Sequence, residues 1–262
     1  MASNLDCLGL GVDSPEAFAD LVDRIGPRAA VVGRAEDGLE VRRWEDPSGA
    51  RLVLVVGERG ILRVTPSFGG ERVVQLGDLQ RAGSEAAVAD VVDGGETVTR
   101  LAIELEELAL LGEGKHAGLA CVVGLAPEVR IFPDAEAFAG SEASLLSDGD
   151  PGPRPEHYEA DWVWPPRMAA ESFIPSGMFG GEVQPLAAVN GRVRYAERRT
   201  TMLTGQDFVV ARVVTAGFEA DVCFPAEVAA PLPGAIVSAN VFLTGSFELE
   251  VPEPRRRWFK RR

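Results

Sequence analysis

The sequence predicts an α+β fold that is mostly β, with an N-terminal α+β domain followed by a small antiparallel β-barrel. Short apolar runs rich in Val, Phe and Thr recur between clusters of Gly, Pro and Asp, which is typical of antiparallel strands joined by tight turns. A clear helical pattern occurs near the N-terminus. The composition, 46% hydrophobic and 25% charged, is that of a globular chain with a substantial core.

The first elements form a predicted β-α-β-β-β unit. Residues 5–10 are apolar and predict a strand. Ser14 is a good N-cap residue and Pro15 suits the first helical position, so we expect a helix to begin there and to end at Gly26. The apolar face of this helix consists of Phe18, Leu21, Val22 and Ile25. Strands are predicted next at residues 29–33, 39–44, 51–56 and 61–65.

A turn at Asp46-Pro47-Ser48-Gly49 joins two of these strands. With its flanking strands it resembles the strand-DPxG-strand hairpin of the vicinal oxygen chelate superfamily, the glyoxalase and bleomycin-resistance type, over roughly the first 65 residues. The resemblance implies a half-module of a fold whose enzymes hold a divalent metal with His and Glu side chains on sheet strands. Because no His lies in this segment, we expect no complete metal site and favour a structural or ligand-binding use.

The middle of the chain continues the strand pattern. A hairpin is predicted at residues 87–93 and 97–104 around Gly94-Gly95, followed by strands at 119–124 and 128–132 and a helix at 134–146. The acidic run Glu104, Glu106 and Glu107 is interpreted as a solvated face.

A cluster of Asp, Gly and Pro at residues 148–153 marks the best domain boundary. The predicted regions are an α+β domain at 1–146, a Pro-rich and aromatic linker or strap at 147–182, a barrel at 183–251 and a flexible basic tail at 252–262.

The linker contains the candidate binding residues Tyr158, Trp162 and Trp164. Trp-rich and Pro-rich segments often pack as straps across an adjoining domain, and a ligand or peptide groove is the alternative. His157 with neighbouring carboxylates could ligate a metal, but a single local His is a sparse ligand set. We therefore assign no metal ligand and no cofactor.

The region at 183–251 predicts a long strand at 192–202, strands at 208–215 and 219–224, and a last apolar strand at 236–247. In strand order it resembles an OB-like five-stranded barrel. On the first strand Arg192, Arg194 and Arg198 are expected on one face, where Arg212 could join them, with Tyr195 on the other face.

OB domains that bind single strands stack bases on aromatic side chains beside a basic groove. Because Tyr195 is expected on the opposite face, we favour a solvated arginine face that is paired with Glu over a nucleic-acid surface.

The tail carries the remaining candidate binding residues, Arg255, Arg256, Arg257 and Trp258. The chain has a net charge of −14, and six of its positive charges lie in residues 255–262, so the remainder carries −14 − 6 = −20. The body should therefore repel nucleic acid and anionic membranes. The tail could bind either of these or fold back on the acidic body.

Several features favour a cytoplasmic protein. The N-terminal residues lack a secretory signal pattern, and the apolar runs are far shorter than the roughly 20 residues of a membrane span. Cys7, Cys121 and Cys223 are scattered among apolar residues, as expected of buried thiols in a reducing compartment. Lys occurs only at Lys115 and Lys260, and this Arg bias resembles proteins of GC-rich bacteria of the actinobacterial type.

No phosphate-binding loop, nucleophile elbow, zinc-protease or CxxC motif is present, and the chain has 2 histidines. We therefore expect a non-enzymatic interaction or scaffold protein that binds a protein partner, although a catalytic role stays open. One alternative is binding of single-stranded nucleic acid through the barrel and tail. Another is a degenerate glyoxalase-like metal enzyme or small-ligand binder. The sequence leaves the oligomeric state open.

Overall fold

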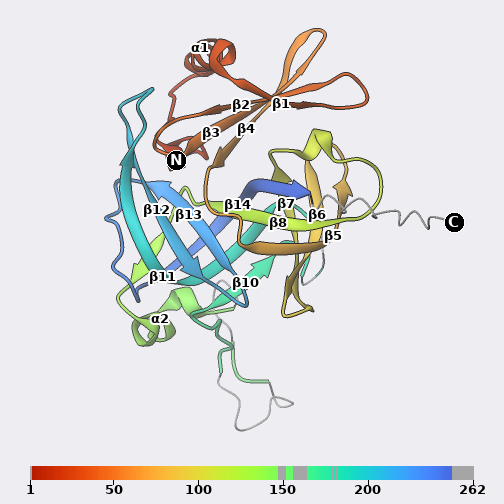
Figure 1. Cartoon of the computed structure of the whole chain (residues 1–262). Helices are drawn as coiled ribbons and strands as arrows, with labels where there is room; N and C mark the ends of the chain where they lie inside the picture. The colour runs from red at the N-terminus through yellow and green to blue at the C-terminus, as the bar shows by residue number, and fades with distance from the viewer. Residues whose placement is uncertain (1, 147–151, 156–163, 179, 181, 250–262) are drawn as a thin grey trace, which may run out of the picture.

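A computed structural model describes residues 2–146, 152–155, 164–178, 180 and 182–249. Strands far outnumber helices, which confirms an α+β chain that is mostly β. Two sheets form the body: a smaller N-terminal sheet lies beside helix α1 and over one part of a larger sheet (Figure 1).

The smaller sheet, sheet A, is an antiparallel meander in the order β1-β2-β3-β4. Its strands are β1 (Ala30–Arg34), β2 (Glu40–Glu45), β3 (Ala50–Gly57) and β4 (Gly60–Phe68). The predicted strands agree closely with these bounds. The turn at Asp46 forms as expected, since the Gly49 amide donates to the Asp46 carbonyl over 2.8 Å and Gly49 has a φ of 88°.

Helix α1 (Pro15–Ile25) also begins where the capping pattern predicts. The Ser14 hydroxyl accepts a hydrogen bond of 3.1 Å from the Ala17 amide. The strand predicted at residues 5–10 is wrong, because this segment contains a single turn of 3-10 helix, η1 (Asp6–Leu8). Its apolar side chains are buried in the core between sheet A and sheet B. Their hydrophobicity therefore reflects burial and not strand pairing.

The larger sheet, sheet B, has ten strands in the order β10-β11-β12-β13-β8-β5-β6-β7-β14-β9. From the first half of the chain come β5 (Val74–Ala82), β6 (Ala86–Asp93), β7 (Glu96–Leu105), β8 (His116–Leu125) and β9 (Arg130–Phe132). From the second half come β10 (Ser172–Pro175), β11 (Leu186–Thr200), β12 (Asp207–Val214), β13 (Glu219–Pro225) and β14 (Ile236–Leu249).

Short helices lie between these strands. They are η2 (Gly26–Arg28), η3 (Leu108–Leu110), α2 (Ala135–Gly140) and η4 (Glu142–Ser144). The helix predicted at 134–146 is thus divided into α2 and η4. The Ser141 side chain, which donates to the Phe138 carbonyl over 2.7 Å, lies at the break between them.

The strand pairings of sheet B form two circuits that share β8 and β14. One runs β11-β12-β13-β8-β14 and back to β11. The other runs β5-β6-β7-β14-β8 and back to β5. The parallel pairings are short, at residues 221–223 of β13 and 244–245 of β14. The strands of residues 183–251 therefore do not close on themselves, because β8 lies between β13 and β14.

The first strands of the two groups, β5 and β11, also pair with their neighbours in the same way. Leu76 on β5 pairs with Val91 and Gly118, and the strand bulges after the next residue. Likewise Arg192 on β11 pairs with Val214 and Ile236, and its pairing with β12 shifts after the next residue. We conclude that β5–β8 and β11–β14 have the same pairing pattern, in which the last strand of each group pairs with the third strand of the other.

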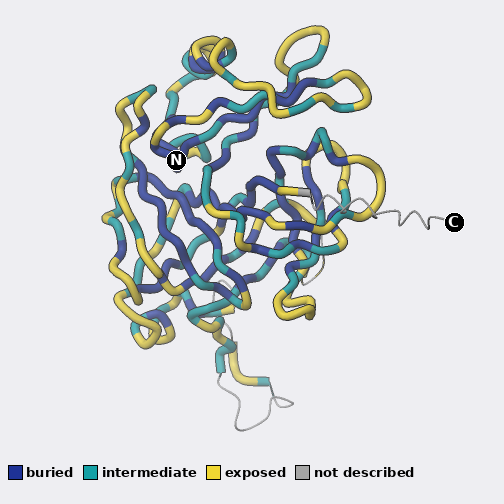
Figure 2. The backbone as a smooth tube through the Cα atoms, in the orientation of Figure 1, coloured by how far each residue is buried: buried dark blue, intermediate teal, exposed yellow. Residues whose placement is uncertain are grey.

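Two hydrophobic cores hold the sheets together, and both combine residues from before and after the predicted linker. One core lies within sheet B, and the second lies between sheet A, η1 and sheet B (Figure 2). The central pairing of β8 with β14 is unusually close at Gly245. A β-carbon there would lie 2.0 Å from the carbonyl oxygen of Cys121, so only glycine fits.

Candidate functional site: a buried polar network between the sheets

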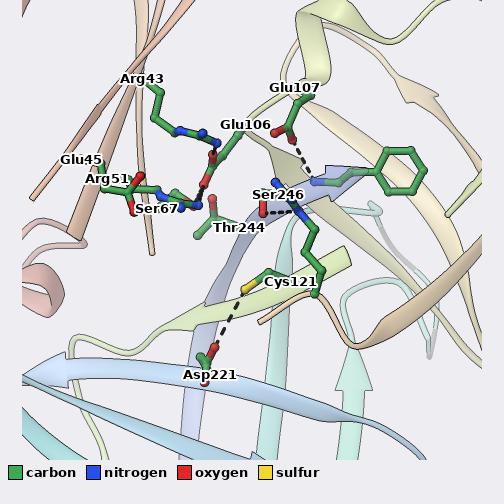
Figure 3. A network of polar contacts seen from close by, with 12 residues as sticks. Arg43, Glu45, Arg51, Ser67, Glu106, Glu107, Cys121, Asp221, Thr244 and Ser246 are labelled. Carbon is green, nitrogen blue, oxygen red and sulfur yellow. Dashed lines mark hydrogen bonds and ion pairs between the residues drawn. The ribbon is translucent and has the colours of Figure 1, made fainter. Parts of the chain in front are cut away.

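The face of sheet A opposite to its apolar core residues Trp44, Leu52 and Phe68 carries polar side chains that meet the end of β7 (Figure 3). Arg43 lies on β2, Arg51 on β3 and Ser67 on β4, and Arg51 pairs directly with Ser67 across the strands. Glu106 follows β7 and is only 2% exposed. A buried carboxylate needs charged or hydrogen-bonding partners, and these three side chains supply them.

All three partners donate to the Glu106 carboxylate. Arg43 Nη1 lies 3.0 Å from Oε2, Arg51 Nη1 lies 3.3 Å from Oε1, and Ser67 Oγ lies 2.8 Å from Oε1. The Glu106 amide also donates to the Gly245 carbonyl over 2.8 Å. Glu106 therefore links three strands of sheet A to β14.

The acidic run is thus not the solvated face expected from the sequence. Besides Glu106, Glu104 Oε1 accepts a hydrogen bond of 2.6 Å from Thr65 Oγ1 and lies 3.7 Å from Arg63 Nε. The prediction is wrong because a run of carboxylates indicates a solvent-exposed face only when no cationic side chains cover it. Here the arginines of sheet A form that layer.

Glu107 has a different environment from Glu106. Its Oε2 accepts a hydrogen bond of 2.9 Å from the backbone amide of Phe247. Burial, together with the nearby charge of Glu106, raises the pKa of Glu107 to about 7, although the Phe247 amide and Arg72 act in the opposite direction. Glu107 can therefore exchange a proton near neutral pH.

A second buried ion pair joins β12 to β13. Arg212 Nε is 3.1 Å from Asp221 Oδ1, and Cys121 Sγ is 3.9 Å from Asp221 Oδ2. Burial raises the pKa of Asp221 to about 6 and that of the Cys121 thiol to about 12. At neutral pH the thiol is protonated and is a poor nucleophile. Cys7, Cys121 and Cys223 are all buried and free, as the sequence predicted.

The chemistry of this network is ion pairing and proton exchange. Within residues that the structure describes, no group of three or more His, Cys, Asp or Glu side chains is arranged to hold a metal ion. The ion pairs of Glu106 with Arg43 and Arg51 join the two sheets, and Glu107 adds a titratable group beside them.

The predicted arginine face is divided by the bulge in β11. Val193 pairs with Val213, but Tyr195 pairs with Arg212, the neighbouring residue on β12. Because directly paired side chains share a face, Tyr195 lies on the face opposite to Val193. Arg192 lies on the same face as Tyr195, since it also alternates with Val193.

Beyond the bulge, Arg198 pairs with Val209 and therefore lies on the opposite face from Arg192. The predicted grouping of Arg192, Arg194 and Arg198 is wrong for this reason, and so is the separation of Tyr195 from Arg192. Arg194 has no strand partner in the bulge, but its ion pair with Glu219, which pairs with Val214 opposite Arg192, places its side chain on this face too. A strict alternation along the strand does not hold through a bulge, and no Gly or Pro at this position signals one.

The arginines on these faces are paired with acidic residues, as predicted. Arg192 Nε lies 2.7 Å from Glu171 Oε1, and Arg194 Nη2 lies 3.2 Å from Glu219 Oε1. Arg198 Nη1 lies 3.2 Å from Asp207 Oδ2. Arg212 does not join an exposed basic face, because it is 3% exposed and bound to Asp221.

The remaining predicted binding residues lie in or near the linker and tail. Trp164 donates from Nε1 to the Gly152 carbonyl over 3.1 Å. Tyr158, Trp162, Arg255, Arg256, Arg257 and Trp258 lie outside the described residues.

Sequence reasoning missed Arg43, Arg51 and Glu106 as a group. A usable signal was present, since Arg43 and Arg51 place charged side chains within the predicted strands 39–44 and 51–56. Such positions need buried partners, and the acidic run after β7 could supply them. The signal does not identify the partner strand, because that depends on how sheet A packs on sheet B.

The fold and this network define a class: an α+β, mostly β chain in which a small N-terminal sheet is joined to a larger sheet by buried ion pairs. Comparison of the chain with protein-family models, with curated proteins and with solved structures found no match. Among the described residues, no helix is long and apolar enough to span a membrane.

Proposed function

We propose that this chain is a cytoplasmic, non-enzymatic interaction protein that binds a protein partner through one face of β11. This surface, the β11 face, consists of Arg192, Arg194 and Tyr195. The observation that carries the proposal is the bulge, which presents Tyr195, 47% exposed, on the side of Arg192. The buried free thiols agree with a reducing compartment.

The residue types on the β11 face are those that dominate binding energy at protein interfaces. Tyr and Arg are enriched among such hot spots because they combine apolar contact area with directional hydrogen bonds. Arg192 and Arg194 are already neutralised by Glu171 and Glu219, so the surface has mixed charge. A protein surface with both signs of charge complements it better than a polyanion does.

Tyr195 is also held in place from below. It is the strand-pairing partner of Arg212 on β12, and Arg212 is fixed by its ion pair with the buried Asp221. An aromatic side chain that is ordered before binding loses little conformational entropy on association. The β11 face is therefore prepared for contact and needs no large rearrangement.

The test is co-purification of partners from the lysate of the source cells, followed by affinity measurement with the purified partner. Replacing both Arg194 and Tyr195 with Ala should weaken binding by about 30-fold or more, since hot-spot residues contribute about 2 kcal/mol or more. Arg198→Ala is the matched control, because it removes an exposed arginine from the opposite face of the same strand.

Equal binding by the double variant and by the Arg198→Ala control would refute the β11 face. Capture that is lost on nuclease treatment would instead favour nucleic acid as the ligand.

Binding of single-stranded nucleic acid is the second candidate, because the bulge brings an aromatic side chain beside two arginines. In this view the circuit of β11, β12, β13, β8 and β14 is OB-like, with β8 in the place of the last strand. Its strand order supports that view, and the net charge of −14 opposes it. Binding of a labelled oligonucleotide that weakens steeply with salt would favour this candidate.

A further inference from the structure

We propose that the basic aromatic tail, residues 252–262, binds back to a specific cleft on sheet B. The cleft is an open hollow of about 550 Å³ between the start of β5, the β6–β7 turn and the β12–β13 turn. We call it the Val73 cleft; its lining includes Val73, Val92, Asp93, Gly95, Phe218 and Glu219. The tail is the occupant that the position, chemistry and charge of this cleft favour.

The position of the cleft relative to the end of β14 supports this occupant. Strand pairing forms one row across four strands, from Glu248 to Leu119, then to Gln75, then to Val92. With adjacent strands about 4.8 Å apart, the row spans about 14 Å. The residues from 250 to Trp258 can extend about 30 Å, so the tail reaches the cleft with length to spare.

The side chains along this route are apolar and exposed. Leu119 is 44% exposed in the row, and Val73 is 49% exposed at the mouth of the cleft. Val98, also exposed, packs beside Gly217 at the far side. These side chains offer contact area for Trp258 and Phe259, the two aromatic residues of the tail.

The rim of the cleft carries the opposite charge to the tail. Asp93 and Glu219 line it, and the exposed carboxylates Glu71 and Glu248 lie on the adjoining chain and strand. Glu219, Glu71 and Glu248 each also contact one arginine, and Glu71 and Glu248 stay more than two thirds exposed. The tail contributes Arg255, Arg256, Arg257, Lys260, Arg261 and Arg262. A local concentration of cations tethered beside an acidic rim favours intramolecular binding over encounter with a separate molecule.

The experiment compares backbone amide chemical shifts in the full chain and in the double variant Trp258→Ala, Phe259→Ala. We expect the largest differences at Val92, Gly94, Gly95 and Gly217, because aromatic rings in the cleft shift nearby nuclei. The differences should shrink several-fold at about 0.5 M salt, where the Debye length is only about 4 Å.

Val73→Lys should produce the same loss of shifts in the full chain, because it places a positive charge, which repels the basic tail, at the apolar mouth. Val31→Lys is the matched control: Val31 is similarly exposed but lies on β1, outside the cleft. It should leave the shifts of the cleft residues unchanged.

Identical amide shifts in the wild-type chain and the double variant would overturn the proposal. Shifts that grow with protein concentration would overturn it in favour of a second copy as the occupant. Shifts that appear only with vesicles of phosphatidylcholine and phosphatidylserine, or only with an oligonucleotide, would assign the tail to those partners instead.

Discussion

Replacing Glu106 with Gln is expected to lower the free energy of unfolding by about 3 to 5 kcal/mol. Gln has nearly the same shape but no charge, so the partly buried Arg43 would lose its anion and Arg51 would keep only its contact with the exposed Glu45. Removing one partner of a buried ion pair exposes the desolvation penalty of the other. Urea unfolding of the full chain, monitored by circular dichroism, measures the change.

Glu45→Gln is the matched control for this prediction. Glu45 Oε1 also contacts Arg51, at 3.0 Å, but its side chain is 45% exposed. An exposed ion pair of this kind contributes about 1 kcal/mol or less. If the two variants lose the same amount of stability, burial does not determine the strength of the Glu106 network.

Replacing Glu107 with Gln is expected to stabilise the protein by about 3 kcal/mol at pH 8 and to have little effect near pH 4. The folded pKa of about 7 lies above the ordinary value of 4.5, so the folded chain retains a proton that the unfolded chain has lost. Each unit of difference corresponds to about 1.4 kcal/mol. Gln remains neutral at every pH and can still accept from the Phe247 amide.

The sign of the pH dependence follows from the same shift. The stability that protonated Glu107 contributes is fully present below about pH 4.5 and is lost as the pH rises through about 7. Unfolding curves at several pH values for wild type and Glu107→Gln should therefore diverge across this window. Glu113→Gln, an exposed loop position, is the control and should change stability by less than about 0.5 kcal/mol. Wild-type and Glu107→Gln curves that stay parallel at all pH values would contradict the prediction.

Local patterns were sufficient for the elements whose signals lie within a few residues. The N-cap at Ser14 predicted the start of α1, and the Gly94-Gly95 turn predicted the β6–β7 hairpin. Both signals express backbone preferences that hold in almost any surroundings. The alternation along β3 and β4 likewise predicted sheet A within one to three residues at each end.

Patterns failed where a distant segment decides the outcome. Residues 5–10 are apolar, but they fill a gap under sheet A and do not join it. The acidic run at Glu106 has the composition of a surface, but the arginines of sheet A cover it. In each case the residue type showed what the chain must bury or pair, and the partner came from elsewhere in the chain.

The sequence by itself determined the mostly β class, the helix α1, the main hairpins and the burial of the three cysteines, because turn chemistry, capping and hydrophobic period are local properties. Only the tertiary structure decided that β8 and β14 pair with both halves of sheet B and that Tyr195 joins Arg192 on one face. The same is true of the contacts of Glu106 with three strands of sheet A. These features depend on strand register and on packing between segments far apart in the chain, and a one-residue bulge reverses which side chains share a surface.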